Sequence, residues 1–153
     1  MEEVNALYTV IKDIFLLLDE GDRHLLEAYG LTVPRFNALM HLGESPGLSV
    51  SELSDHMSCD KSNVTRLIQG LEADDLVRRQ PHETDGRVLC LHLTGRGEEL
   101  LGEALERHCR HNERRFDSGL RPAERAALLS SLLKLRDTLQ CDLQMSPASA
   151  VEG

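Results

Sequence analysis

The 153-residue sequence contains no tryptophan, two tyrosines and three phenylalanines, so its hydrophobic core must be built from aliphatic side chains. It also lacks a long apolar segment. The longest uninterrupted apolar run, Ile14–Leu18, is far short of the ~18 residues that a membrane span needs. The N-terminus, Met-Glu-Glu-Val, has no basic region of the kind that begins a secretory signal. We therefore expect neither a membrane protein nor a secreted one, and we expect a cytoplasmic location.

Basic residues are in the minority. The sequence has 17 Lys and Arg against 26 Asp and Glu, which gives a net charge of −9. This balance argues against nonspecific coating of nucleic acid, because neutralising phosphates requires many Lys and Arg. A local basic patch on an acidic body remains compatible with it. Hydrophobic residues make up 41% of the chain, which is enough for the core of one domain.

Motifs for metal binding and catalysis are also missing. The four cysteines form no Cys-x-x-Cys pair and match no zinc ribbon, so free thiols are the simplest interpretation. They are Cys59, Cys90, Cys109 and Cys141. We find no nucleophile elbow, no glycine-rich phosphate loop and no paired-carboxylate motif. The sequence therefore predicts neither an enzyme nor a cofactor.

Helical periodicity is clearest at the two ends of the chain. Apolar residues three or four apart predict helices over residues 3–28, from about 95 to 118, and from Pro122 to 139. The apolar stripes Val4–Leu18 and Ala126–Leu139 are too broad for the free surface of a monomer. We expect these terminal helices to pair with a second copy of the chain.

Two short helices joined by a tight turn are predicted in the middle of the chain. Ser49 and Glu52 form a capping box at the start of a helix over Val50–Met57. After Ser58 and Cys59, Asp60 is placed to cap the next helix, from Lys61 to about Ala73. One side of this second helix is apolar and is expected to be buried, while its other side is polar.

Two strand patterns follow, over Leu76–Gln80 and Val88–Leu93, with a turn at Asp85-Gly86 and an arginine at the tip of the connecting loop. Two helices, a turn and such a hairpin predict a winged helix-turn-helix, in a fold that is mainly α with a small β-hairpin wing. The polar helix suits the major groove, and Arg87 suits the minor groove. The candidate DNA-binding residues are Lys61, Ser62, Asn63, Thr65, Arg66, Gln69, Asp85 and Arg87.

Several motifs, taken together with their order and spacing, make the sequence similar to the MarR family of transcriptional regulators over roughly residues 4–140. They are Leu31-Thr32-x-x-x-Phe36-x-x-Leu39, Leu53-Ser54, Asp60-Lys61-Ser62-Asn63-Val64-Thr65-Arg66-Leu67-Ile68, Leu71-Glu72, Leu76-Val77-x-Arg79, Asp85-x-Arg87 and Leu93-Thr94-x-x-Gly97. The family usually has glycine where this chain has Asp75, a position that favours a positive φ.

The resemblance implies an obligate homodimer that binds a pseudo-palindromic DNA operator and represses until a small ligand, often phenolic, releases it. It also implies that Ser62, Asn63, Thr65 and Arg66 read the major groove, and that Asp85 and Arg87 form the wing contact. The organisation that follows has dimerisation helices in residues 1–30 and 98–142, a winged helix-turn-helix in 31–97, and a flexible tail in 143–153.

Three alternatives remain open. Cys59 precedes the N-terminus of the polar helix, where the helix dipole favours the thiolate, so it is a candidate redox sensor. His108 and His111 share one helix face and are candidate metal ligands. A dimeric interaction module that has lost DNA binding is the third alternative, and the presence of Arg66 and Arg87 argues against it.

Overall fold

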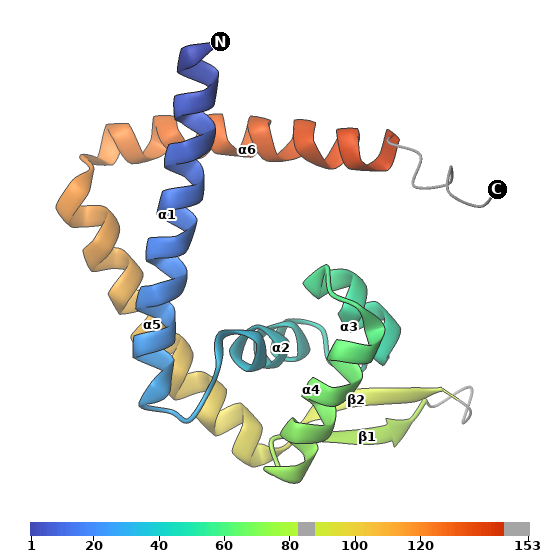
Figure 1. Ribbon diagram of the computed structural model, residues 1–153. Coiled ribbons are helices and arrows are strands. Elements are labelled where there is room, and N and C mark those ends of the chain that lie inside the picture. The colour runs from blue at the N-terminus through green and yellow to red at the C-terminus, as the bar shows by residue number, and fades with distance from the viewer. Residues whose placement is uncertain (83–87, 146–153) are drawn as a thin grey trace. The chain divides into compact units, whose positions relative to one another are not determined.

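The computed structural model describes residues 1–82 and 88–145, and along them four helices are followed by one hairpin and two further helices (Figure 1). The elements are α1 Glu2–Glu27, α2 Val33–Glu44, α3 Val50–Met57, α4 Lys61–Ala73, β1 Val77–Pro81, β2 Leu89–Leu93, α5 Gly95–Gly119 and α6 Pro122–Met145. This order confirms the winged helix-turn-helix fold, with each predicted strand shifted by one residue at its start. Within the described residues, no helix combines the length and the apolar character that crossing a membrane requires.

The chain divides into two compact units, and the boundary falls inside α5, between His108 and Cys109. The first unit holds the hydrophobic core, in which α2, α3, α4 and the hairpin surround aliphatic side chains. Leu39, Leu53, Ile68 and Leu71 are among those that are fully buried. Phe36 is the one aromatic side chain buried in this core among the described residues, so the packing depends mainly on the close fit of branched aliphatic side chains.

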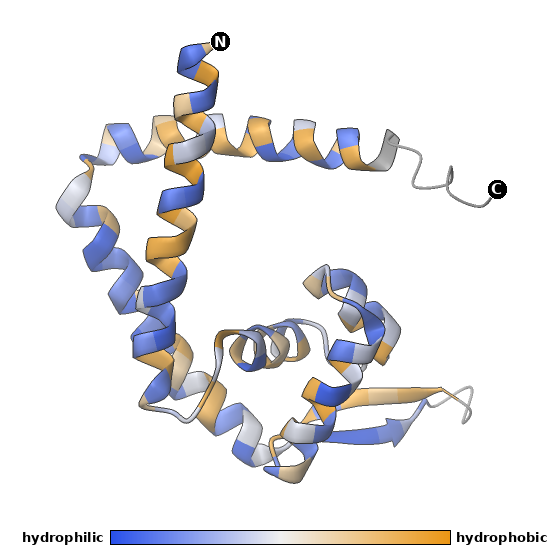
Figure 2. Ribbon diagram, viewed as in Figure 1, coloured by the Kyte–Doolittle hydropathy of each residue, from blue (hydrophilic) through white to orange (hydrophobic). Residues whose placement is uncertain are grey.

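The hairpin has one polar and one apolar strand. β1 and β2 pair antiparallel, with Val77 opposite Leu93 and Arg78 opposite His92. Figure 2 shows the difference plainly, since β1 is hydrophilic and β2 hydrophobic along most of its length. Leu91 of β2 is fully buried and also accepts and donates backbone hydrogen bonds with Gly47 and Leu48. The base of the wing is therefore anchored in the core.

Thr94 joins the end of α4, the hairpin and the start of α5. Its hydroxyl donates to the carbonyl of Asp75 at 2.6 Å and accepts from the N–H of Gly97 at 3.0 Å, while its own N–H donates to the carbonyl of Leu76 at 3.1 Å. Gly97 is buried, and a Cβ added there would lie 2.0 Å from the oxygen of Leu76. The motif Leu93-Thr94-x-x-Gly97 therefore caps α5 and lets it touch the backbone that leads into β1.

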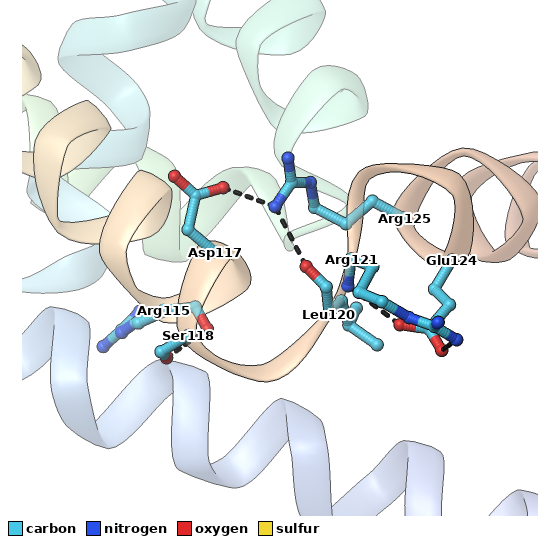
Figure 3. Close-up of polar contacts among 7 residues, drawn as sticks. All are labelled: Arg115, Asp117, Ser118, Leu120, Arg121, Glu124 and Arg125. Carbon is cyan, nitrogen blue, oxygen red and sulfur yellow. Dashed lines mark hydrogen bonds and ion pairs between the residues drawn. The ribbon is translucent and has the colours of Figure 1, made fainter.

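The corner between α5 and α6 is held by polar contacts within the second unit (Figure 3). Arg125 pairs with Asp117 and donates to the carbonyl of Leu120 at 3.1 Å. The Glu124 carboxylate accepts from the N–H of Arg121 at 2.8 Å and from its guanidinium at 2.6 Å. These bonds lower the pKa of Glu124 and fix the first turn of α6.

Candidate nucleic-acid interface

The first helix of the helix-turn-helix, α3, begins with the predicted capping box. The hydroxyl of Ser49 accepts from the N–H of Glu52 at 3.2 Å, and the Glu52 carboxylate accepts from the N–H of Ser49 at 2.7 Å. The backbone hydrogen bond from Ser49 lowers the pKa of Glu52, as does the Ser49 side chain. The carboxylate is therefore held in its charged form at the positive end of α3.

The turn into α4 is tight. Ser58 ends α3 in the left-handed region, with φ 50°, and the next N–H, of Cys59, donates to the carbonyl of Ser54 at 3.0 Å. Asp60 stands at the N-cap of α4, and its carbonyl accepts from Asn63 at 2.9 Å. The predicted side-chain cap is wrong, however, since the Asp60 carboxylate caps none of the described N–H groups. The backbone alone makes the connection.

Helix α4 has one buried face and one free face. Val64, Ile68 and Leu71 are buried in the core, as the sequence predicted. The opposite face carries the candidate DNA-binding residues of this helix, all exposed apart from the half-buried Thr65: Lys61, Ser62, Asn63, Thr65, Arg66 and Gln69. The six residues are thus brought together on one helix. Within the described residues, none of these six side chains makes a hydrogen bond or ion pair with another helix or strand, so the face is available to an external partner.

Two side chains of this face are oriented by bonds within the helix. The Arg66 guanidinium donates to Oδ1 of Asn63, with the two atoms 3.5 Å apart. The hydroxyl of Thr65 donates to the carbonyl of Lys61 at 2.7 Å. Both contacts span three or four residues, as neighbours on one helix surface do.

Acidic side chains near the end of α4 are neutralised by arginines. Arg35 of α2 pairs with Asp74, and Arg79 of β1 lies 3.1 Å from Glu72. These pairs explain two residues that the sequence left without a role, Arg35 and the Arg79 of the family motif. They also reduce the net negative charge at the end of α4.

Asp75 has a φ of 57°, which confirms that the position requires the left-handed conformation usually served by glycine. Its N–H donates to the carbonyl of Glu72 at 3.0 Å, so the chain reverses here between α4 and β1. Two predicted wing residues, Asp85 and Arg87, lie outside the described residues, and their DNA contact stays a prediction.

Two exposed arginines were not among the predicted DNA-binding residues: Arg78 on β1 and Arg96 at the start of α5. Neither takes part in an ion pair with any residue that the structure describes. A signal existed for Arg78, because alternation along β1 places it on the opposite side from the buried Val77.

The structure bears differently on the redox hypothesis for Cys59 and the metal hypothesis for His108 and His111. Cys59 is exposed in the turn before α4, so the redox hypothesis remains a prediction. His108 lies with Nε2 3.4 Å from Oδ2 of Asp22 and packs its ring against Phe36, with the ring centres 5.2 Å apart. Across the described ranges, no three His, Cys, Asp or Glu side chains are grouped as metal ligands. His108 and His111 thus lack a third described ligand.

The family model for the MarR family matches residues 29–88, which is the part of the chain that builds the helix-turn-helix and enters the wing. A regulatory protein assigned to the hcr operon of Thauera aromatica is 31% identical over 113 residues, covering 74% of this chain and 68% of that protein.

Solved structures agree with this match. A MarR family protein from Bacillus stearothermophilus superposes with a TM-score of 0.79 at 28% identity, over 91% of this chain and 96% of that one. The transcriptional repressor CouR, bound to a 23-mer DNA duplex, gives a TM-score of 0.79 at 27% identity, over 88% and 95% of the two chains. These relatives are transcriptional regulators, not enzymes.

Proposed function

The chain belongs to the MarR family of transcriptional regulators, and from this we propose that it binds a pseudo-palindromic DNA operator as a homodimer and represses transcription until a small-molecule effector releases it. Proteins of this family bind DNA, so the proposal concerns how this chain does so. A repressor of this kind acts on the chromosome, and we therefore also propose a cytoplasmic location.

The observation that carries the proposal is the free face of α4. It is polar and exposed, and it contains the guanidinium of Arg66 held by Asn63. An arginine makes a bidentate contact with guanine in the major groove, and an α-helix fits that groove. A two-fold dimer presents two such helices about one DNA turn apart, roughly 34 Å, which matches inverted half-sites.

Selection of bound DNA from a random pool tests this directly. We expect recovery of an inverted repeat, and we expect Arg66→Ala to weaken binding and relax the preference at one base pair, by ~1–3 kcal/mol. Arg23→Ala is the matched control, since it removes an exposed arginine of α1 that pairs with Glu20, and sedimentation checks that this variant, in the proposed dimerisation segment, still dimerises. Enrichment of no sequence, or equal binding by the parent and Arg66→Ala, contradicts the proposal.

The wing contact is a separate part of the proposal. Arg87, with Asp85 beside it in sequence, is proposed to enter the minor groove next to the half-site. Because that groove carries little sequence information, Arg87→Ala should weaken binding evenly across operator variants. Loss of base preference in Arg87→Ala, with preference retained in Arg66→Ala, would exchange the two roles.

The apolar surfaces of α1 and α6 support the homodimer. Leu26 is the only buried side chain among the described residues of α1, and α6 has none through residue 143. Their exposed apolar side chains include Val4, Leu7, Tyr8, Phe15, Leu128, Leu129, Leu132 and Leu139. So much exposed apolar surface at the two ends of the chain calls for a partner, and we propose that residues 1–30 and 98–142 pair with those of a second copy.

Sedimentation of two matched variants tests the dimer. Phe15 and Leu16 are each 60% exposed, but at 100° per residue they lie on different sides of α1, and only Phe15 belongs to the stripe that includes Val4 and Tyr8. We expect Phe15→Glu to dissociate the dimer and Leu16→Glu to leave it intact. A parent protein that sediments as a monomer at all concentrations would exclude the dimer.

The effector is proposed to occupy an open pocket of about 540 Å³ beside the first turns of α5. Met40, Leu101 and Leu105 give it an apolar wall, and Arg78 and His92 contribute polar groups. Gly102 also lines the pocket. A Cβ added at Gly102 would have no atom within 4 Å. Gly102→Phe should therefore fill the pocket without disturbing the core.

Phenol and benzoate are suitable first probes. We expect one of them to weaken operator binding by the parent protein and to have no effect on Gly102→Phe. An equal response of the two proteins would place the effector site elsewhere.

A further inference from the structure

Within the recognition helix α4, Thr65 differs from its polar neighbours because its hydroxyl already has a partner. Oγ1 donates its only proton to the carbonyl of Lys61 at 2.7 Å, one turn earlier in the helix. A contact in which this hydroxyl donates to guanine N7 or O6, or to thymine O4, would have to break that bond. The hydrogen bond thus removes Thr65 as a donor to base edges and leaves its γ-methyl as the apolar group that it can present.

Thr65 lies at the edge of the free face of α4. Ser62 precedes it by three residues and Gln69 follows it by four, so the three side chains form one row along α4. Asn63 and Arg66 form a second, adjacent row, joined by their own hydrogen bond. The half-buried Thr65 therefore lies where the polar face meets the core, with exposed neighbours on the side away from the core.

We propose that Thr65 selects a thymine in each half-site by contact between its γ-methyl and the 5-methyl group of the base. Thymine is the only base that carries a methyl group on its major-groove edge, and apolar side-chain groups read it by contact. This inference rests on the proposed function, because it requires that α4 enter the major groove. It goes further by assigning to Thr65 a thymine-specific apolar contact, distinct from the polar readout by Arg66.

The competing role for Thr65 is to accept a hydrogen bond. Oγ1 keeps lone pairs after donating to Lys61, so an amino group of adenine or cytosine is the alternative partner. Only the methyl contact responds to uracil, which is thymine without the methyl group and presents the same hydrogen-bonding edge, whereas a hydrogen bond accepted from adenine or cytosine would be unaffected. Replacing thymine by uracil therefore tests the methyl contact alone.

The experiment begins with the operator selected from random DNA. Each thymine of the half-site is then replaced by deoxyuridine, one position at a time, and binding of the full-length protein is measured by fluorescence anisotropy. At one position we expect affinity to fall about fourfold per half-site, which corresponds to the ~0.8 kcal/mol of burying one methyl group. Replacing both half-sites should multiply the loss to roughly 15-fold.

Two conservative variants assign the effect to Thr65. Thr65→Ser keeps the hydroxyl and removes the methyl, so it should bind the thymine and uracil operators equally at that position. Thr65→Val keeps a methyl and removes the hydroxyl, so it should retain the preference for thymine. Thermal unfolding followed by circular dichroism confirms that each variant is folded at the assay temperature.

The outcomes separate this inference from the proposed function. If no sequence is enriched from the random pool, the operator-binding proposal itself fails. If an operator is found but no uracil position changes the affinity of the parent, only the methyl contact is wrong. The contact is also overturned if Thr65→Ser keeps the full preference for thymine, or if Thr65→Val loses it.

Discussion

Replacing Gly97 by alanine should destabilise the protein strongly, although alanine is the better helix former. The new Cβ would lie 2.0 Å from the carbonyl oxygen of Leu76 and 3.0 Å from its carbonyl carbon. Both are backbone atoms, so no side-chain rotation relieves the contact. Helix α5 would have to move away from the entry to β1 by about 1 Å or more, because non-bonded carbon atoms pack about 3.5–4.0 Å apart.

The expected magnitude follows from three terms. Overpacking of a buried position costs about 1–3 kcal/mol. The shift also strains the 3.1 Å hydrogen bond from Thr94 N–H to the same Leu76 oxygen, whose loss costs about 1 kcal/mol. Alanine stabilises the folded state by about 0.5–1 kcal/mol relative to glycine, because its backbone has less entropy in the unfolded chain. The net loss is therefore about 2 kcal/mol, a large part of the ~5–15 kcal/mol that stabilises a typical domain.

Gly102→Ala is the matched control in the same helix. No atom lies within 4 Å of a Cβ at Gly102, so only the helix-propensity gain remains and this variant should be more stable than the parent by up to about 1 kcal/mol. Urea unfolding at one fixed protein concentration measures both variants, with a midpoint about 1 M lower expected for Gly97→Ala. If Gly97→Ala unfolds at the parent midpoint, or Gly102→Ala unfolds earlier, the packing described for α5 against Leu76 is wrong.

Three further changes have directions fixed by the structure. Asp75→Gly should raise the thermal midpoint, because glycine adopts the left-handed conformation at φ 57° without the steric strain of a side chain, a gain of up to about 1 kcal/mol. An unchanged or lower midpoint would mean that the Asp75 side chain stabilises the turn. Ser49→Ala should lower stability by about 1 kcal/mol in chemical denaturation, since it removes the side-chain cap of α3. The lowered pKa of Glu52 contributes stability above the ordinary value of 4.5, and that contribution is lost as the pH falls through the folded-state pKa. The difference in unfolding free energy between the parent and Glu52→Gln should therefore shrink on acidification, and a difference independent of pH would contradict this assignment.

Local sequence patterns predicted most of the fold because they act over a few residues. The reciprocal bonds of Ser49 and Glu52 need only a spacing of three, and the cap that Thr94 places on α5 needs the same. The alternation of apolar and polar positions placed both strands within one residue of their observed starts. The positive φ at Asp75 was predictable too, because a family that prefers glycine there reveals the conformation.

Contacts between distant residues could not be predicted in this way. Arg35 and Asp74 are 39 residues apart, and only the packing of α2 against α4 brings them together. The same limit applied to the capping role assigned to Asp60, since an N-cap residue type does not determine which way its side chain turns. For the candidate interface, periodicity identified the polar face of α4. The hydrogen bond from the Thr65 hydroxyl to the Lys61 carbonyl could be seen only from atomic positions.

The contacts around Thr94 constrain how a signal could release DNA. Thr94 bonds to Asp75 after α4, to Leu76 before β1 and to Gly97 in α5, while β2 lies immediately before it. Helix α4 and the base of the hairpin are thus fixed to one another through short backbone and hydroxyl bonds around Thr94, next to Gly97, where an added Cβ would collide with the Leu76 backbone. Withdrawing the wing alone, or α4 alone, would break this junction and expose core side chains. Under the proposed function, an effector that leaves the first unit folded would therefore move α4 and the wing together, and we propose that α5 transmits this movement, because this helix continues from Gly95 to Gly119 past the unit boundary at His108.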